Sequence, residues 1–172
     1  SSPFYAERDT LSWSNMTALT DLEIYNCRNL GALPVEMLAQ LPELIQLNVA
    51  CNKGIPAEQL KADWEAIIDG APCATLQILY MGYNNLKEFP SHERLKRMVK
   101  LGMLDCASNQ IETLHPFGKE IQIAKIYLDN NKITEIPCAE DGYFCGFAQL
   151  ESFTCSNNRL KLFPDIFNAK SV

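Results

Sequence analysis

Several features that catalysis, metal binding or membrane insertion would require are missing from this sequence. It has only two histidines, His92 and His115, no Cys-x-x-Cys pair, no Gly-x-Ser-x-Gly motif, and no phosphate-binding loop among its eight glycines. No apolar run approaches the roughly 18 residues of a membrane-spanning helix. We therefore expect a protein that is not an enzyme, holds no metal or cofactor, and has no membrane span.

Positive charge is also in short supply. The 172 residues contain 15 Lys and Arg against 21 Asp and Glu, which gives a net charge of −6 and a pI near 4.9. An acidic chain repels phosphate backbones, so nucleic acid is not an expected partner. With 47% hydrophobic residues, the length suits one domain over 1–172 with a sizeable core, which we expect to be monomeric. Because the sequence opens at Ser1-Ser2 without an initiator Met, we expect it to be part of a longer protein.

What the sequence has in abundance is an internal repeat. A pattern Leu-x-x-Leu-x-Leu-x-x-Asn, with a further apolar residue two or three places on, recurs six times, starting near residues 19, 44, 76, 101, 123 and 150. The copies are Leu19, Leu22, Ile24, Cys27, Leu30; Leu44, Leu47, Val49, Asn52, Ile55; Leu76, Leu79, Met81, Asn84, Leu86; Leu101, Leu104, Cys106, Asn109, Ile111; Ile123, Ile126, Leu128, Asn131, Ile133; and Leu150, Phe153, Cys155, Asn158, Leu160. Such a period indicates a repeat architecture in which neighbouring units share one core.

These residues resemble the leucine-rich repeat family over almost the whole chain. The resemblance implies an α/β solenoid of about six repeats, a horseshoe with one parallel β-sheet on its concave face and helical or irregular returns on its convex face. The fourth and sixth positions of each copy are two apart, so on a strand they point to the same side, toward the core. The ninth-position residues form an expected structural ladder that pairs turn backbone: Asn52, Asn84, Asn109, Asn131 and Asn158.

Between strands, the convex returns show helical periodicity in places. Residues 57–69 place Leu60, Trp64 and Ile67 on one face, with Asp63 expected on the opposite, solvent side. Residues 91–99 predict a second helix with Ser91 as its N-cap, and residues 34–40 predict a shorter helical turn. Trp64 is therefore expected in the core rather than at a docking surface.

Seven cysteines raise the question of redox compartment. Cys106 and Cys155 occupy inward strand positions and are expected to behave as small buried hydrophobes. Cys138 and Cys145 flank the longest insertion. They either form a disulfide in an oxidising compartment or remain two free thiols.

A second, looser resemblance concerns the stretch Gly142 to Phe147 and the end of the following repeat, Leu162 to Phe167. Both look like leucine-rich repeat proteins of gut Bacteroidales bacteria, many of which are exported, often as surface lipoproteins. This resemblance implies a secreted or cell-envelope location.

The outward side chains of the strands are the candidate binding residues. They include four of the six tyrosines, and the whole predicted surface is Glu23, Tyr25, Tyr80, Tyr83, Asp105, Tyr127 and Asp129. Tyrosine combines apolar area with a polar group and is enriched at interfaces, although it also suits strands for purely structural reasons. We expect a concave face that recognises a protein, with its acidic groups suiting a basic patch, or a glycan. The alternative is the substrate-recognition domain of a larger protein whose catalytic domain lies elsewhere.

Overall fold

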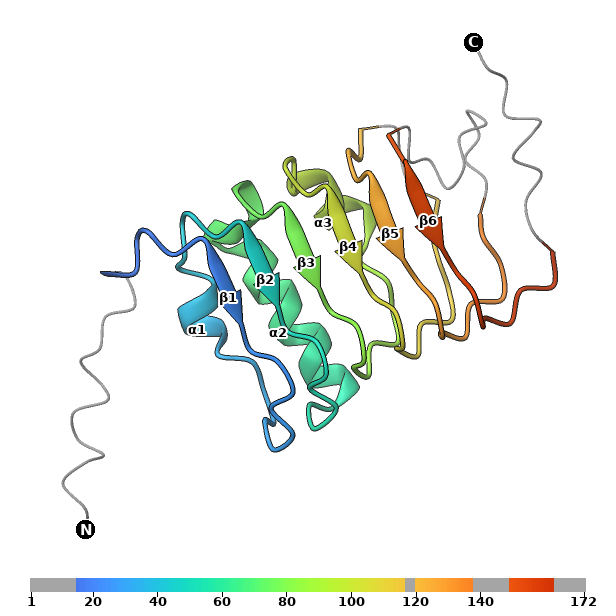
Figure 1. Ribbon diagram of the computed structural model, residues 1–172, viewed down its shortest axis with the longest axis horizontal. Coiled ribbons are helices and arrows are strands. Elements are labelled where there is room, and N and C mark those ends of the chain that lie inside the picture. Colours follow the sequence, from blue (N-terminus) through green and yellow to red (C-terminus); the bar gives the residue numbers. More distant parts are fainter. Residues whose placement is uncertain (1–14, 117–119, 138–148, 163–172) are drawn as a thin grey trace.

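Six short parallel strands form one sheet in the computed structural model, which describes residues 15–116, 120–137 and 149–162 (Figure 1). The strands are β1 Asp21–Glu23, β2 Gln46–Asn48, β3 Ile78–Tyr80, β4 Met103–Asp105, β5 Lys125–Tyr127 and β6 Ser152–Thr154. They lie in chain order, each paired in parallel with the next. The predicted single parallel sheet is confirmed.

The register of the sheet follows the repeat. The fourth-position residues pair with one another across all six strands, from Leu22 through Leu47 and onward to Phe153. Their side chains point into one core, and Leu104 and Ile126 there are fully buried. Because every strand returns to the same register, side chains at any given repeat position form a straight column across the sheet.

The returns that cover the inner face of the sheet contain helices as far as residue 97. They contain α1 Val35–Leu38, α2 Ala57–Asp69, the 3-10 helix η4 Ala71–Ala74 and α3 His92–Arg97. Helix α2 has the predicted bounds, and its Leu60, Trp64 and Ile67 are buried as expected. Helix α3 is shorter than the predicted residues 91–99, because the chain turns at Met98, which is buried, and leaves Val99 exposed. Ser91 is the N-cap residue as predicted, but its side chain makes no capping hydrogen bond.

Asp63 lies on the buried face of α2, so its expected position in solvent is wrong. Only 4% of the residue is exposed. Its Oδ2 accepts the backbone N–H of Leu33 at 2.7 Å, and its Oδ1 accepts the Gln59 Nε2 at 2.6 Å. Helical periodicity predicts that a charged side chain faces solvent. Here the Asp63 carboxylate is buried because it accepts a hydrogen bond from the backbone of the preceding return.

Each strand ends in a sharp turn whose central residue has a left-handed backbone. This is the eighth position of every repeat, with φ between 55° and 62° at Asn26, Cys51, Tyr83, Ser108, Asn130 and Asn157. Asparagine tolerates this conformation because its side chain can satisfy nearby backbone groups, whereas larger side chains adopt it rarely. Cys51 and Tyr83 are thus the exceptions in this column.

Behind these turns, the ninth-position asparagines bond to the backbone of two repeats at once. The Asn109 Nδ2 donates to the carbonyl of Cys106 in its own repeat at 3.0 Å and to that of Met81 in the preceding repeat at 2.9 Å, while its Oδ1 accepts the Leu86 N–H at 2.9 Å. Asn131 in turn donates to the same Cys106 carbonyl at 3.0 Å. Asn158 makes the corresponding contacts. Asn52 and Asn84 donate to carbonyls in the same way, but their Oδ1 atoms accept the ninth-position N–H of the preceding repeat, that of Cys27 and of Asn52.

The ladder is therefore a chain of shared acceptors. Each internal carbonyl at the sixth position receives two amides, one from its own repeat and one from the next, as the Met81 carbonyl does from Asn84 and Asn109. All of these groups face backbone, and Asn52, Asn84, Asn109 and Asn131 are buried.

Candidate functional site

Three of the predicted binding residues form a row on the outer face of the sheet, the face opposite the core. The register places Asp105 of β4 directly between Tyr80 of β3 and Tyr127 of β5. Neighbouring strands are about 4.8 Å apart, so the two tyrosines are roughly 10 Å apart. All three residues are half-buried. We call Tyr80, Asp105 and Tyr127 the central row.

The carboxylate of Asp105 is held close to the sheet. Its Oδ1 accepts the backbone N–H of Ala107 at 2.8 Å, just as the Asn48 Oδ1 in the same column accepts the Ala50 N–H at 3.0 Å. Burial, opposed by the hydrogen bond from Ala107, raises the pKa of Asp105, and the charge of Asp129 raises it further. Asp105 and Asn48 therefore accept the same kind of backbone hydrogen bond, although one side chain is charged and the other is neutral.

Asp129 sits two residues beyond β5 and bonds across to the neighbouring repeat. Its Oδ1 accepts the Ser156 N–H at 2.7 Å, and its Oδ2 accepts the hydroxyl of Thr154. The carboxylates of Asp105 and Asp129 are therefore both engaged by groups of the sheet itself. The remaining predicted acid, Glu23, is exposed on β1 and lies two strands away from Tyr80 in the same column.

The other two predicted tyrosines gather at the ends of the first strands, around a residue that was not predicted. Tyr25 and Tyr83 are 54% and 52% exposed, and the half-buried Cys51 lies with them. A side-chain hydrogen bond with Cys51 raises the pKa of Tyr25, and the charges of Cys51 and Tyr83 and slight desolvation act in the same direction. We call Tyr25, Cys51 and Tyr83 the tyrosine cluster.

A hollow of about 540 Å³ opens beside the tyrosine cluster. It is lined by Asn26, Arg28, Cys51, Lys53, Gly54 and Tyr83. The backbones of Gly54 and Arg28 approach closely there, since a Cβ on Gly54 would lie only 2.5 Å from the Arg28 carbonyl oxygen. Arg28 and Lys53 were not predicted, because they lie at the tenth repeat position, outside the strands. The signal that reveals them is the tenth column of the repeat, which reads Arg28, Lys53, Asn85, Gln110, Lys132 and Arg159.

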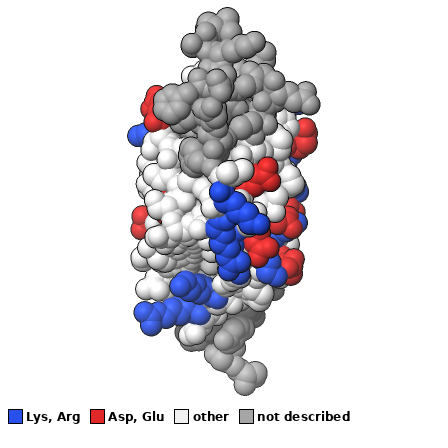
Figure 2. All heavy atoms as spheres, turned by 90° about the vertical axis from the view of Figure 1, so that its right-hand side faces the viewer, with Lys and Arg blue, Asp and Glu red and all other residues white. Residues whose placement is uncertain are grey.

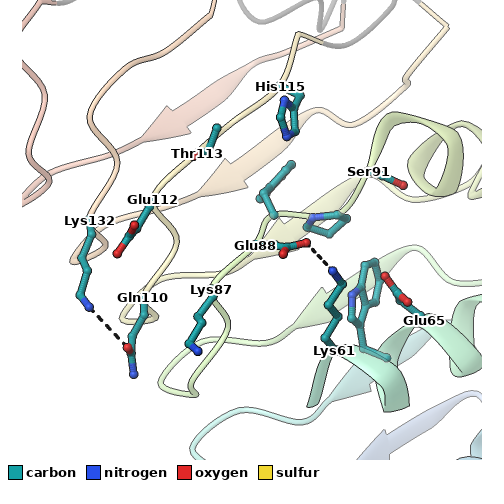
Figure 3. Close-up of a pocket in the computed structure, with 13 residues that line it drawn as sticks. Lys61, Glu65, Lys87, Glu88, Ser91, Gln110, Glu112, Thr113, His115 and Lys132 are labelled. Atoms are coloured by element: carbon teal, nitrogen blue, oxygen red, sulfur yellow. Dashed lines mark hydrogen bonds and ion pairs between the residues drawn. The ribbon is translucent and has the colours of Figure 1, made fainter. Parts of the chain in front are cut away.

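A second hollow, of about 580 Å³, lies on the return side of the molecule, between helix α2 and the extended returns of the following repeats (Figure 3). Lys61 and Glu88 point toward one another across it with an ion pair of 2.5 Å, and Lys132 reaches Gln110 at 3.4 Å. Its lining includes Trp64, whose body is otherwise in the core. Irregular returns carry no periodic signal, so no sequence pattern indicated this hollow.

Neither surface has the groups of a metal centre. Within the described residues, no group of three or more His, Cys, Asp and Glu could hold a metal ion. The same part of the chain contains no helix of the length and apolarity needed to cross a membrane. Of the cysteines expected inward, Cys106 is fully buried and Cys155 is half-buried. Cys138 and Cys145 lie outside the described residues.

Charge is unevenly spread over the molecule. Figure 2, which looks at the C-terminal end of the sheet, shows acidic side chains gathered along one side among basic ones, and further down basic side chains without acidic neighbours. The ion pairs found among the described residues belong to α2, α3 and the return segments, between residues 58 and 120.

Comparison with known proteins agrees with this architecture. A leucine-rich repeat protein from Bacteroides eggerthii is 50% identical with a TM-score of 0.79, over 96% of this chain and 26% of that one. A second, from Bacteroides thetaiotaomicron, is 48% identical with a TM-score of 0.76, over 98% of this chain and 20% of that one. Lumican from Rattus norvegicus is 40% identical over 85 residues, which are 49% of this chain and 24% of lumican. No protein-family profile matches the chain.

Six repeats on one parallel sheet, joined by an asparagine ladder, define a leucine-rich repeat solenoid. Within that class, the chain is similar to leucine-rich repeat proteins of Bacteroides at 48–50% identity. It spans about a quarter of the length of these proteins, or less. The fold is typical of a non-catalytic binding scaffold.

Proposed function

We propose that this chain is a non-catalytic module that binds a protein or glycan partner through the outer face of its sheet, at the bacterial cell envelope. The observation that carries the proposal is the central row, in which two half-buried tyrosine rings flank Asp105 in strict register. The tyrosine cluster extends the same face toward the strand ends. Aromatic side chains with a polar group are the residues that most often anchor such contacts.

The dimensions of the sheet support this role. Six strands at about 4.8 Å spacing span roughly 24 Å between the outer two. A face of that width can host a standard protein contact of about 800 Å² per partner. The parallel register keeps the columns aligned over the whole width, so an extended ligand can contact Tyr80 and Tyr127 together.

In the same proposal, the asparagine ladder supports the face without touching the partner. The amide groups of the four buried ladder asparagines, Asn52, Asn84, Asn109 and Asn131, all bond to backbone. A buried amide in this situation has little capacity left for a ligand. Its contribution to binding is to hold the strands in register.

A location at the cell envelope is supported by the similarity to Bacteroides proteins over nearly the whole of this chain. Fractionation of cells that produce the full-length protein tests it. Recovery in the outer-membrane or secreted fraction agrees with the proposal, and recovery in the cytosol alone contradicts it.

The binding experiment combines capture with substitution. The immobilised chain captures partners from cell extracts and glycan arrays, and the affinity of whatever binds is then measured for the double variant Tyr80→Ala with Tyr127→Ala. Loss of a central aromatic anchor can cost 2 kcal/mol or more, roughly thirtyfold in affinity. Val99→Ala, which removes an exposed apolar side chain from the return side, is the matched control. Unchanged affinity in a folded double variant would rule out the central row.

A second candidate function is substrate recognition within a larger enzyme. It is favoured by one observation, the small share of the matched proteins that this chain spans. The complete gene discriminates the two candidates: an appended catalytic domain supports the second, whereas a lipobox or signal peptide supports the first.

A further inference from the structure

The side chains at the ends of the strands differ in charge from the rest of this acidic protein. The tenth repeat position places Arg28, Lys53, Lys132 and Arg159 along the edge where the strands end. None of the four forms an ion pair within the described part of the chain, whereas the paired lysines and arginines there lie on the return side.

At the two middle repeats of this edge, the tenth-position side chains are neutral, and they form hydrogen bonds with residues of the neighbouring repeats. The Asn85 Nδ2 donates to the Lys53 carbonyl at 2.8 Å, the Gln110 Nε2 donates to Asn85 Oδ1 at 3.4 Å, and the Lys132 Nζ donates to Gln110 Oε1 at 3.4 Å. The Lys132 ammonium is therefore partly used within the edge. Arg28 and Lys53, at the other end, are both exposed and stand beside the hollow of about 540 Å³.

The same hollow is where two residues other than Asn and Ser occupy the left-handed turn. Cys51 and Tyr83 have φ values of 62° and 56° at positions that Asn or Ser fills in the other four repeats. A non-glycine residue pays roughly 1–2 kcal/mol for this conformation, and a ring gains none of the local hydrogen bonding that makes it acceptable for asparagine. The result is that the Tyr83 ring is presented outward, next to Tyr25, at the rim of a cationic hollow.

We infer that the hollow beside Arg28, Lys53 and the tyrosine cluster binds an acidic, extended segment of a protein partner. The inference rests on the proposed function and deepens it, because it assigns a charge to the bound segment. Arginine binds carboxylates with two parallel hydrogen bonds, and lysine adds a point charge. Alternate side chains of an extended peptide are about 6.6 Å apart, and cations from neighbouring repeats, with backbones about 4.8 Å apart, can meet two of them.

This assignment differs from the expectation that the acidic groups of the outer face select a basic partner. The carboxylate of Asp105 accepts a backbone N–H, and that of Asp129 accepts a backbone N–H and a hydroxyl, so both are already engaged. The two cations beside the tyrosine cluster have no carboxylate partner among the described residues. Complementarity therefore favours negative charge on the segment that reaches the tyrosines.

The test uses defined probes and charge reversal on the whole chain. A short blocked peptide of alternating glutamate and valine, its lysine–valine counterpart and a galacturonate oligosaccharide are titrated while amide chemical shifts are recorded. The glutamate peptide is expected to bind, to shift residues around Tyr25 and Tyr83, and to bind more weakly as salt is raised. Arg28→Glu with Lys53→Glu is expected to weaken it at least tenfold.

The matched control is Lys96→Glu with Lys100→Glu, which changes the net charge equally at two exposed return-side positions and should leave the affinity within twofold. The milder Arg28→Gln with Lys53→Gln serves if the reversal variant does not fold. Equal binding of the acidic and basic peptides, or wild-type affinity in the Arg28/Lys53 variants, would overturn the inference. Tighter binding of the galacturonate, lost in the same variants, would also overturn it and reassign the site to a glycan.

The two proposals fail separately. If Tyr80→Ala with Tyr127→Ala leaves partner affinity unchanged while the Arg28/Lys53 reversal abolishes peptide binding, the central row is wrong and the hollow stands. The opposite pattern removes the hollow and leaves the proposed function in place.

Discussion

Replacement of Asn109 by alanine tests the role of the ladder most directly, because this side chain lies between two repeats in the middle of the sheet. The substitution removes an acceptor from the Leu86 N–H and donors from the Met81 and Cys106 carbonyls. The two carbonyls keep a second amide each, from Asn84 and Asn131. The Leu86 N–H is thus the group that loses its side-chain acceptor.

The loss of stability is set mainly by the Leu86 N–H, because the two carbonyls each keep another donor. An unsatisfied buried backbone donor costs about 1–3 kcal/mol, and carbonyls that retain a partner add little. For a domain of this size, each 1 kcal/mol lowers Tm by roughly 2–4 °C. We expect Asn109→Ala to lower Tm by about 2–12 °C. Asn158→Ala, at a half-exposed position where water can replace the amide, should cost less.

Thermal unfolding followed by circular dichroism measures both variants, and Asn109→Asp adds a diagnostic. Its carboxylate can still accept the Leu86 N–H, but at neutral pH it faces the Met81 and Cys106 carbonyls without a donor. It should therefore destabilise the fold more than alanine does, and less so once it is protonated. A Tm for Asn109→Ala within about 1 °C of wild type would refute the reasoning.

Two further predictions concern charge and thiols. The pKa of Asp105 is raised in the folded protein, chiefly by burial, so its contribution to stability falls as pH rises from its ordinary value of 3.8 through the folded value. Asp105→Asn keeps the backbone contact, as Asn48 shows, and removes both the partly buried charge and its repulsion from Asp129, so it should stabilise the protein at neutral pH by up to about 1 kcal/mol, with no gain below pH 3.8. A gain of equal size at acidic pH would contradict this cause. Any disulfide should join Cys138 and Cys145, because Cys106 and Cys155 occupy inward strand positions. Mass spectrometry of the unreduced protein decides it, and a bridge that uses Cys106 or Cys155 would contradict the prediction.

The sheet could be predicted from sequence because the repeat encodes it redundantly. The fourth and sixth positions of every copy carry apolar side chains that face the core, and the same spacing recurs six times, so the register of Leu47 against Leu79 follows without any knowledge of tertiary structure. Helix α2 was predictable for the same reason, because its apolar residues recur at a helical period.

What escaped prediction depends on contacts between segments. Asp63 is buried because the Leu33 N–H, some thirty residues earlier, needs an acceptor, and helical periodicity carries no such information. The tyrosine cluster required knowing that Cys51 and Tyr83 take left-handed turns side by side. The hollow beside Arg28 and Lys53 required a column outside the strand. The place of a residue within its repeat can be predicted from the sequence, whereas the residues that it contacts in other repeats cannot.

The shared carbonyls have a consequence for how such a protein can change its length. Each internal sixth-position carbonyl accepts one amide from its own repeat and one from the next, so this contact of an asparagine carries no requirement for a particular preceding repeat. Excision of a whole unit, such as residues 101–122, would bring Asn131 to the Met81 carbonyl and the Leu86 N–H, the two groups of the preceding repeat that Asn109 contacts. Duplication or loss of a repeat can thus leave the joint chemically unchanged, so genetic rearrangement can lengthen or shorten the outer face of the sheet without redesigning it.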